Sequence, residues 1–163
     1  FEGVFTRAFH ERMGAKLGLA GWRPADEPLL DDLLKLMDAN QADFTLTWRR
    51  LAQAVLGERA PFQDLFIDRA AASHWLDRLL ARQAEDGRAA AEVAAAMNRV
   101  NPLYVLRNHL AEEAIRAAKA GDATEIGTLM TLLRDPFTAR AGCEKYAGLP
   151  PDWANGIEVS CSS

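Results

Sequence analysis

The stretch Asp26-Glu27-Pro28-Leu29-Leu30-Asp31-Asp32-Leu33-Leu34-Lys35-Leu36-Met37 decides the fold class. Its apolar residues recur at intervals of three and four, which places them on one face of a helix that follows Asp26 and Pro28. The same spacing continues along most of the chain, and only the short stretch at residues 156–160 alternates as a β-strand would. The sequence therefore predicts an all-α fold, an irregular bundle of about seven helices with an extended C-terminal tail.

The segments on either side of this stretch show the same helical spacing. Downstream, Asp43 and Asp68 are expected to begin two helices, because an aspartate side chain can accept hydrogen bonds from the unpaired amides of a first turn. The first of these two helices should bury Phe44 and Trp48 and end at Gly57. Upstream, one helix is expected to turn a single apolar face to the core, made of Phe5, Phe9, Met13 and Leu17.

Two more helix starts are predicted in the C-terminal third. Asn101-Pro102 should begin a helix, since asparagine can cap it and proline at its first position has no amide to leave unpaired. Asp122 and Glu125 should form a capping-box-like pair at the start of a helix that Asp135-Pro136 ends. The first of these helices is expected to point four residues inward: Leu106, Leu110, Ala114 and Ala117.

Length and charge limit the classes of function. The chain has 163 residues, 49% of them hydrophobic, which is enough for one ordinary folded core. A net charge of −4 and a pI near 5.4 favour neither a nucleic acid nor an anionic membrane surface as a partner. No stretch approaches the roughly 18 apolar residues that span a bilayer, and no signal peptide is visible. The expected location is the bacterial cytoplasm.

Two cysteines lie outside the predicted long helices. Cys161 is flanked by serines near the C-terminus, where a thiol is accessible to partners that a buried cysteine could not reach. The sequence leaves open a redox role for Cys161 and an incidental thiol at a frayed end. A bridge to Cys143 is geometrically conceivable, although a cytosolic setting argues against a permanent disulfide.

Several motifs together resemble one protein family. In chain order they are Met13-Gly14-Ala15-Lys16-Leu17-Gly18-Leu19, Asp43-Phe44-Thr45-Leu46-Thr47-Trp48-Arg49-Arg50-Leu51, Asn101-Pro102-Leu103-Tyr104-Val105-Leu106-Arg107-Asn108, Gly121-Asp122, Leu132-Leu133-Arg134-Asp135-Pro136-Phe137, Leu149-Pro150-Pro151-Asp152-Trp153 and the terminal Cys161-Ser162-Ser163. This order is similar to the C-terminal part of the selenoprotein O (SelO) family. The resemblance implies kinase-like enzymes that transfer AMP from ATP, with Mg²⁺, to hydroxyl groups of proteins.

The resemblance also implies what this segment lacks. The family's nucleotide-binding and catalytic motifs lie in a kinase-like region before the matched part, and this chain has no Gly-rich phosphate loop, no Asp-Phe-Gly metal site and no catalytic-loop Asp with a following Asn. No catalytic, cofactor-binding or metal-binding residue is therefore expected here. The first residue, Phe1, fits a fragment better than a complete gene product. The family's terminal cysteine or selenocysteine is expected to pair with a cysteine of the kinase-like region, which assigns that redox role to Cys161.

Three polar clusters have competing interpretations. Arg107 and Asn108 belong to the family signature and are candidates for docking against the kinase-like region, or they are ordinary polar residues of a helix surface. His109 with Glu112 and Glu113 could bridge a divalent metal, but a solvated charged face is the favoured interpretation. Trp48-Arg49-Arg50 is interpreted as a core tryptophan with surface arginines and not as a nucleic-acid site.

The sequence-based prediction divides the chain into a helical C-terminal module, residues 1–149, and an extended redox tail, residues 150–163. The parent protein is expected to be a protein adenylyltransferase that binds ATP and Mg²⁺, contacts its own kinase-like region and acts on protein substrates, whereas this segment alone should not turn over ATP. The alternatives are a self-standing helical protein-interaction module and, more remotely, a metal enzyme built on His109.

Overall fold

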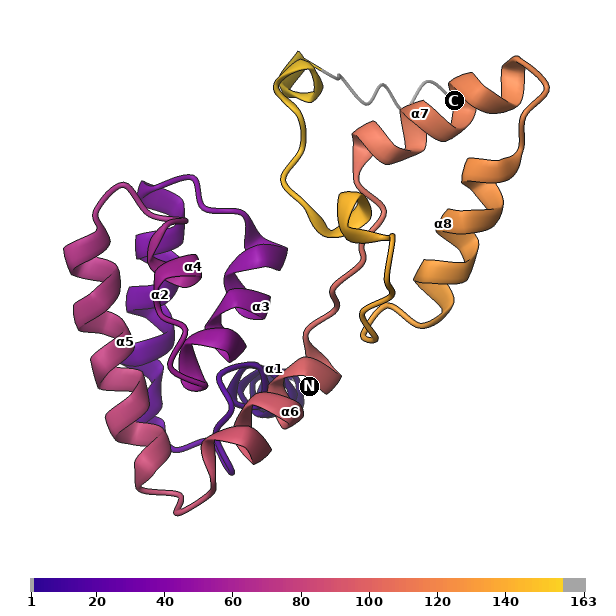
Figure 1. The fold of residues 1–163 in the computed structure, drawn as a ribbon. Coiled ribbons are helices and arrows are strands. Elements are labelled where there is room, and N and C mark those ends of the chain that lie inside the picture. Colours follow the sequence, from indigo (N-terminus) through magenta and orange to yellow (C-terminus); the bar gives the residue numbers. More distant parts are fainter. Residues whose placement is uncertain (1, 157–163) are drawn as a thin grey trace. The chain divides into compact units, whose positions relative to one another are not determined.

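The computed structural model describes residues 2–156 and shows only helices and connecting segments in that range, which confirms the all-α prediction (Figure 1). Cys161 and the alternating stretch at residues 157–160 lie outside the described residues. The elements are α1 (Glu2–Lys16), η1 (Pro24–Asp26), α2 (Glu27–Ala39), α3 (Phe44–Val55), α4 (Ala60–Gln63), α5 (Arg69–Ala84), α6 (Ala90–Val100), α7 (Asn108–Lys119), α8 (Thr124–Arg134), η2 (Glu144–Ala147) and η3 (Asp152–Gly156).

The chain forms two compact units, with the boundary between Asn101 and Pro102. In the first unit α3 packs against α4 and α6, and α2 packs against α5. Its core includes Leu33, Trp48 and Leu76, each almost fully buried, and Trp75, whose indole Nε1 donates a 2.8 Å hydrogen bond to the carbonyl of Leu29. In the second unit α7 packs against α8. The predicted module boundary at residue 149 is not tested by this division and stays a prediction.

Two predicted helix caps are confirmed. The Asp43 carboxylate accepts a hydrogen bond from the amide of Leu46 at 2.8 Å, and the Asp68 carboxylate accepts one from the amide of Ala71 at 2.9 Å. These bonds satisfy amides that have no partner inside the first turn of a helix. They fix the starts of α3 and α5 at the positions that the sequence indicates.

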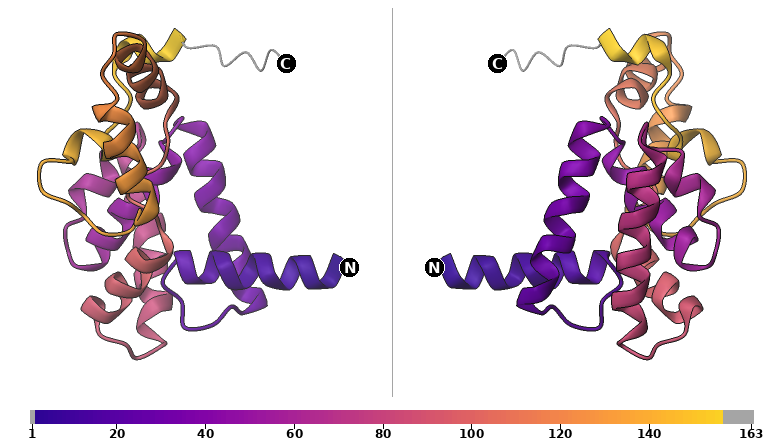
Figure 2. Two further views of the ribbon diagram at one scale, coloured as in Figure 1. Left: turned by 90° about the vertical axis from the view of Figure 1, so that its right-hand side faces the viewer. Right: turned by 90° about the vertical axis from the view of Figure 1, so that its left-hand side faces the viewer.

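The prediction that Phe5, Phe9 and Phe44 face the core is wrong. Phe5 and Phe9 are 72% and 42% exposed, and Phe44, at the first position of α3, is 54% exposed. The first half of α1 projects beyond the other helices of its unit (Figure 2), and Phe5 and Phe9 are left partly or largely uncovered. On the same helix face Met13 and Leu17 are buried as expected.

The helix predicted at Asn101-Pro102 starts later, at Asn108. The amides of Leu103 and Tyr104 both donate to the carbonyl of Pro136, at 2.7 and 3.1 Å, so this backbone is not free to form a helical turn. The Asn101 side chain is fully buried: it accepts from the Lys16 ammonium at 2.9 Å and donates to the Lys16 carbonyl at 3.2 Å. Long-range partners thus replace the predicted cap.

Leu106 was expected to face the core but is 56% exposed, because it precedes α7 in the extended segment. Leu110 and Ala114 are buried as predicted. They pack in the core of the second unit, which is completed by Tyr104, Leu129, Leu132 and Tyr146.

The capping box predicted for α8 forms only in part. Asp122 accepts a 2.9 Å hydrogen bond from the amide of Thr124, as expected. Glu125 does not reach back along its own helix, because its carboxylate instead accepts from the Tyr146 hydroxyl at 2.7 Å and from the Lys145 ammonium at 3.0 Å. These bonds hold η2 against α8 and keep the pKa of Glu125 below its ordinary value.

A buried ion cluster fixes the connection between α1 and α2. Arg82 on α5 donates to Asp26 at 2.7 Å and to Asp86 at 2.9 Å, and the three side chains are only 10%, 2% and 5% exposed. The second carboxylate oxygen of Asp86 accepts from the amide of Ala20 at 2.8 Å, and Arg82 also donates to the carbonyl of Gly21 at 3.2 Å. The loop that carries Trp22 is therefore tied to the C-terminal end of α5.

Candidate functional site

The two candidate docking residues lie at the beginning of α7, in the second unit. Arg107 has an extended backbone just before the helix and is half-buried, whereas Asn108 is exposed. Together with His109 they line a pocket of about 300 Å³ whose other wall is formed by Pro150 and Ala154. The structure thus places the predicted docking pair and the segment where the predicted tail begins around one pocket.

Trp153 holds that segment on α7. Its ring stands edge-on to the His109 imidazole, with centroids 6.2 Å apart and an interplanar angle of 85°. The Arg116 guanidinium lies 5.7 Å from the centre of the same ring, a cation–π geometry, and also donates to Glu112 at 3.2 Å. The sequence analysis quoted Trp153 only as part of a motif and gave it no role of its own.

His109 is not part of a solvated face, so that interpretation is wrong for the imidazole. The side chain is only 5% exposed. Burial lowers the pKa of His109 from its ordinary value, the nearby Arg107 charge acts in the same direction, and Glu113 opposes both. The ring is therefore neutral near pH 7 and serves as a packing partner for Trp153.

The described residues contain no group of three or more His, Cys, Asp or Glu side chains that could hold a metal ion. In the same range no helix is both long enough and apolar enough to cross a bilayer.

The predicted redox residue, Cys161, lies outside the described residues, and its role stays a prediction. Cys143 is half-buried and forms no disulfide with another described residue. It lines a groove of about 480 Å³ along α8, beside Thr128, Thr131 and Arg140. A bridge between the two cysteines is likewise untested.

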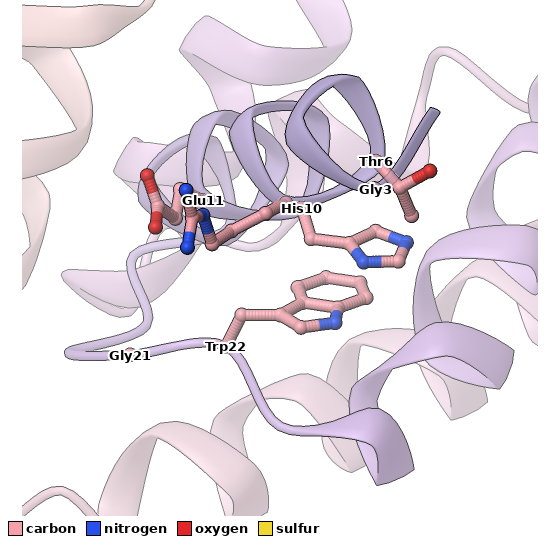
Figure 3. Close-up of a pocket in the computed structure, with 7 residues that line it drawn as sticks. Gly3, Thr6, His10, Glu11, Gly21 and Trp22 are labelled. Atoms are coloured by element: carbon pink, nitrogen blue, oxygen red, sulfur yellow. The ribbon is translucent and has the colours of Figure 1, made fainter. Parts of the chain in front are cut away.

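A larger pocket that the sequence analysis did not anticipate lies in the first unit. It measures about 850 Å³ and is built where α1 meets the loop that carries Trp22. Figure 3 shows the His10 imidazole lying parallel to the Trp22 indole, with centroids 4.6 Å apart and an interplanar angle of 10°. Thr6 and Glu11 of α1 stand at its rim (Figure 3). The sequence analysis assigned no role to His10 and missed this pair.

The described residues form an all-helical chain, and no catalytic cluster stands out among them. Comparison with related proteins therefore identifies its class. The family model described as protein adenylyltransferase SelO matches residues 1–134. The chain belongs to the SelO family. This confirms the resemblance drawn from its motifs.

The curated relatives carry the name protein nucleotidyltransferase YdiU. The protein from Bordetella petrii is 67% identical over 165 residues, which cover all of this chain and 33% of the relative. The relative from Bordetella pertussis is 65% identical over 163 residues, with 34% of its length covered, and the one from Burkholderia pseudomallei strain K96243 is 52% identical over 166 residues, with 32% covered. The chain thus spans about a third of the length of the curated relatives it matches.

Proposed function

We propose that this chain is the C-terminal helical region of a SelO-type protein adenylyltransferase in the bacterial cytoplasm, and that it supports a kinase-like catalytic part located elsewhere in the protein. The observation that carries the proposal is the family match over residues 1–134 in a chain only about a third as long as its nucleotidyltransferase relatives. The reaction transfers AMP from ATP to a serine, threonine or tyrosine hydroxyl of a protein. ATP and Mg²⁺ bind to the catalytic part, and no residue of this chain is assigned to hold them.

Arg107 and Asn108 form the polar part of the contact with the kinase-like region in this proposal. They line the pocket at the start of α7, where a partner's carboxylate or carbonyl could receive a directional hydrogen bond. Asn108 is exposed and available to such a partner. Protein substrates are recognised by the full-length enzyme, and neither a nucleic acid nor a membrane is a partner.

Cys161 acts as a redox-regulatory residue in the same proposal. Trp153 holds the chain on α7, and Cys161 follows eight residues later in the sequence. A disulfide between Cys161 and a cysteine of the kinase-like region would couple the redox state to activity. Cys143 supplies a matched control thiol, since it belongs to the same unit and lies only half-buried in a groove.

AMP transfer by the full-length protein tests the proposal. The protein is incubated with Mg²⁺ and ATP labelled on the α-phosphate, in reduced or oxidised glutathione, and label on protein is measured. We expect Mg²⁺-dependent labelling that responds to the glutathione couple, a response lost in Cys161→Ser and kept in Cys143→Ser. No labelling under any condition would refute the adenylyltransferase function, and an unchanged response in Cys161→Ser would refute the redox role alone.

The alternative of a self-standing interaction module makes a different prediction. An antibody to residues 150–163 would then detect a native polypeptide near 17.9 kDa in cells of the source organism. A much larger polypeptide is expected if the chain is one region of an adenylyltransferase.

A further inference from the structure

The first half of α1 is little covered by the rest of its unit. Every residue from 3 to 9 is exposed, whereas Met13 and Gly14 on the same helix are buried. This stretch amounts to about two helical turns. Figure 2 shows the indigo end of α1 extending beyond the remaining helices of the first unit.

One apolar stripe runs from the core into this projecting segment. Residues four apart share a helix face, and along that face the exposed fraction rises toward the N-terminus. Leu17 is 0% exposed, Met13 7%, Phe9 42% and Phe5 72%. Val4, beside Phe5, is 63% exposed. The face that forms the core at Met13 and Leu17 thus continues as an uncovered aromatic ridge.

A neighbouring face of the same segment is hollowed and carries different chemistry. The pocket of about 850 Å³ is lined there by Gly3, Thr6, Arg7, His10 and Trp22, with the His10 and Trp22 rings stacked on each other (Figure 3). Trp22 is held in place because its loop is tied to Asp86 through the amide of Ala20. A partner could therefore contact α1 from two sides, with an apolar ridge and an aromatic groove.

Two bare helical turns are not stable on their own. They continue a helix that Met13 and Leu17 already hold in place, so no new nucleation is needed, but tertiary packing supplies most helical stability and these turns have little of it. Gly3 weakens this segment further, by roughly 1 kcal/mol relative to alanine. An uncovered stripe with two phenylalanines is the kind of surface that marks an interface.

We propose that the first two turns of α1 dock onto the remainder of the full-length protein, with Phe5 and Phe9 buried there. The occupant is the part of the chain that the relatives have and this sequence does not, about two-thirds of their length. An intramolecular partner costs no translational entropy on association, unlike a second copy of the chain. The inference rests on the proposed function, because it assigns a surface to the contact between this region and the catalytic part.

Hydrogen exchange on the full-length protein tests this surface. In the parent protein the amides of residues 5–12 should exchange at least about tenfold more slowly than in the Phe5→Asp variant. Phe5→Leu should keep the protection, because leucine also fills an apolar site. The matched control is Ile67→Asp, which changes an 89% exposed residue of the same unit and should leave the exchange of residues 5–12 unaltered. Unchanged exchange in the core of α5 shows that a variant remains folded.

Three outcomes overturn the proposal. Rapid exchange of residues 5–12 in the parent protein means that the segment is not docked at all. Protection that Phe5→Asp leaves intact means that another face is covered. Protection that grows with concentration and follows a dimer in sedimentation equilibrium means that a second copy covers the ridge.

The two proposals fail separately. Protection without AMP transfer refutes the adenylyltransferase function and leaves the docked surface standing. AMP transfer without protection refutes the docked surface alone.

Discussion

Replacing Arg82 by methionine should destabilise the first unit far more than replacing any exposed arginine. The side chain bridges Asp26 and Asp86, so the substitution leaves two buried carboxylates without their shared cation. Removing one partner of a buried ion pair typically costs about 3–5 kcal/mol. Arg23 and Arg88 lie 3.5 and 3.7 Å from Asp86 and still offset part of its negative charge in the variant. We therefore expect a loss of stability at the lower end of that range, about 3 kcal/mol.

Urea unfolding followed by tryptophan fluorescence measures this loss. Three of the four tryptophans belong to the first unit, so the signal reports mainly on that unit. With a urea dependence of about 1–3 kcal/mol per molar, the midpoint should fall by roughly 1–3 M. The matched control is Arg78→Met: Arg78 pairs with Asp32 at 2.7 Å, but both side chains are more than 40% exposed, so its loss should stay below about 1 kcal/mol.

The pH dependence separates a charge effect from lost packing. Burial alone would raise the pKa of Asp86, but hydrogen bonds from the Ala20 amide and Arg82 outweigh it and hold the pKa below its ordinary value. This contribution to stability is therefore present above the ordinary carboxyl pKa and is lost as the pH falls through the lower folded value. Without Arg82 the pKa of Asp86 in the folded protein rises, so Asp86 takes up a proton at a higher pH in the variant than in the parent protein. The difference in unfolding free energy between the two proteins should therefore shrink between about pH 7 and pH 4.

The reasoning fails if Arg82→Met loses no more stability than Arg78→Met. It also fails if the deficit stays constant over that pH range, because the loss would then come from packing and not from two uncompensated carboxylates.

Three further substitutions test other contacts. Gly18→Ala should lower the free energy of unfolding by more than about 2 kcal/mol, because Gly18 has φ +72° and an added Cβ would lie 2.7 Å from Val93 Cγ1. Thermal unfolding measures this loss, and an unchanged melting temperature would contradict it. Tyr146→Phe removes the 2.7 Å hydrogen bond to Glu125, so it should lower the free energy of unfolding by about 1–2 kcal/mol and raise the pKa of Glu125. Chemical denaturation and an NMR titration measure the two effects, and no change in either would show that this hydrogen bond contributes nothing. Trp153→Ala removes the ring contacts with His109 and Arg116, so it should speed proteolysis around residue 150. Trp153→Phe should do so less because an aromatic ring remains. Equal cleavage of the parent protein and both variants would show that Trp153 does not hold this segment on α7.

Local signals were sufficient for most helix starts. Asp43 and Asp68 each satisfy an amide three residues ahead, so the information lies within one turn and can be read from the sequence. The apolar spacing likewise predicted which face of α2 is buried, with Leu30 and Leu33 at 2% and 0% exposure. Such features depend on neighbours in the chain and not on the tertiary fold.

Long-range partners account for the errors. The Asn101 side chain bonds to Lys16, 85 residues away, and Glu125 bonds to Tyr146, 21 residues away, so neither is left for the predicted local cap. Periodicity assigned Phe5 to a buried stripe, but burial requires another element to pack on that face, and Phe5 is 72% exposed. The spacing of apolar residues shows which of them share a helix face, but not how far along the helix that face is covered by another element.

The candidate site was partly predictable. Arg107 and Asn108 were singled out from the motif, and the structure places both in one pocket. The clamp of Trp153 between His109 and Arg116 was not predicted, since it joins segments about 40 residues apart. Its one local signal is an aromatic residue directly after the Pro150-Pro151-Asp152 turn. Cys161 stays a sequence-based prediction.

The pairing of Lys16 with Asn101 also matters while the protein is being made. The first helix of the unit packs against the last one, α6, so this contact and the Lys16–Asn101 pair cannot form until residue 101 has left the ribosome. At about 5–20 residues per second, the intervening 85 residues take roughly 4–17 s to synthesise. Throughout that interval the apolar side chains of α1 lack the packing that α6 provides in the folded unit.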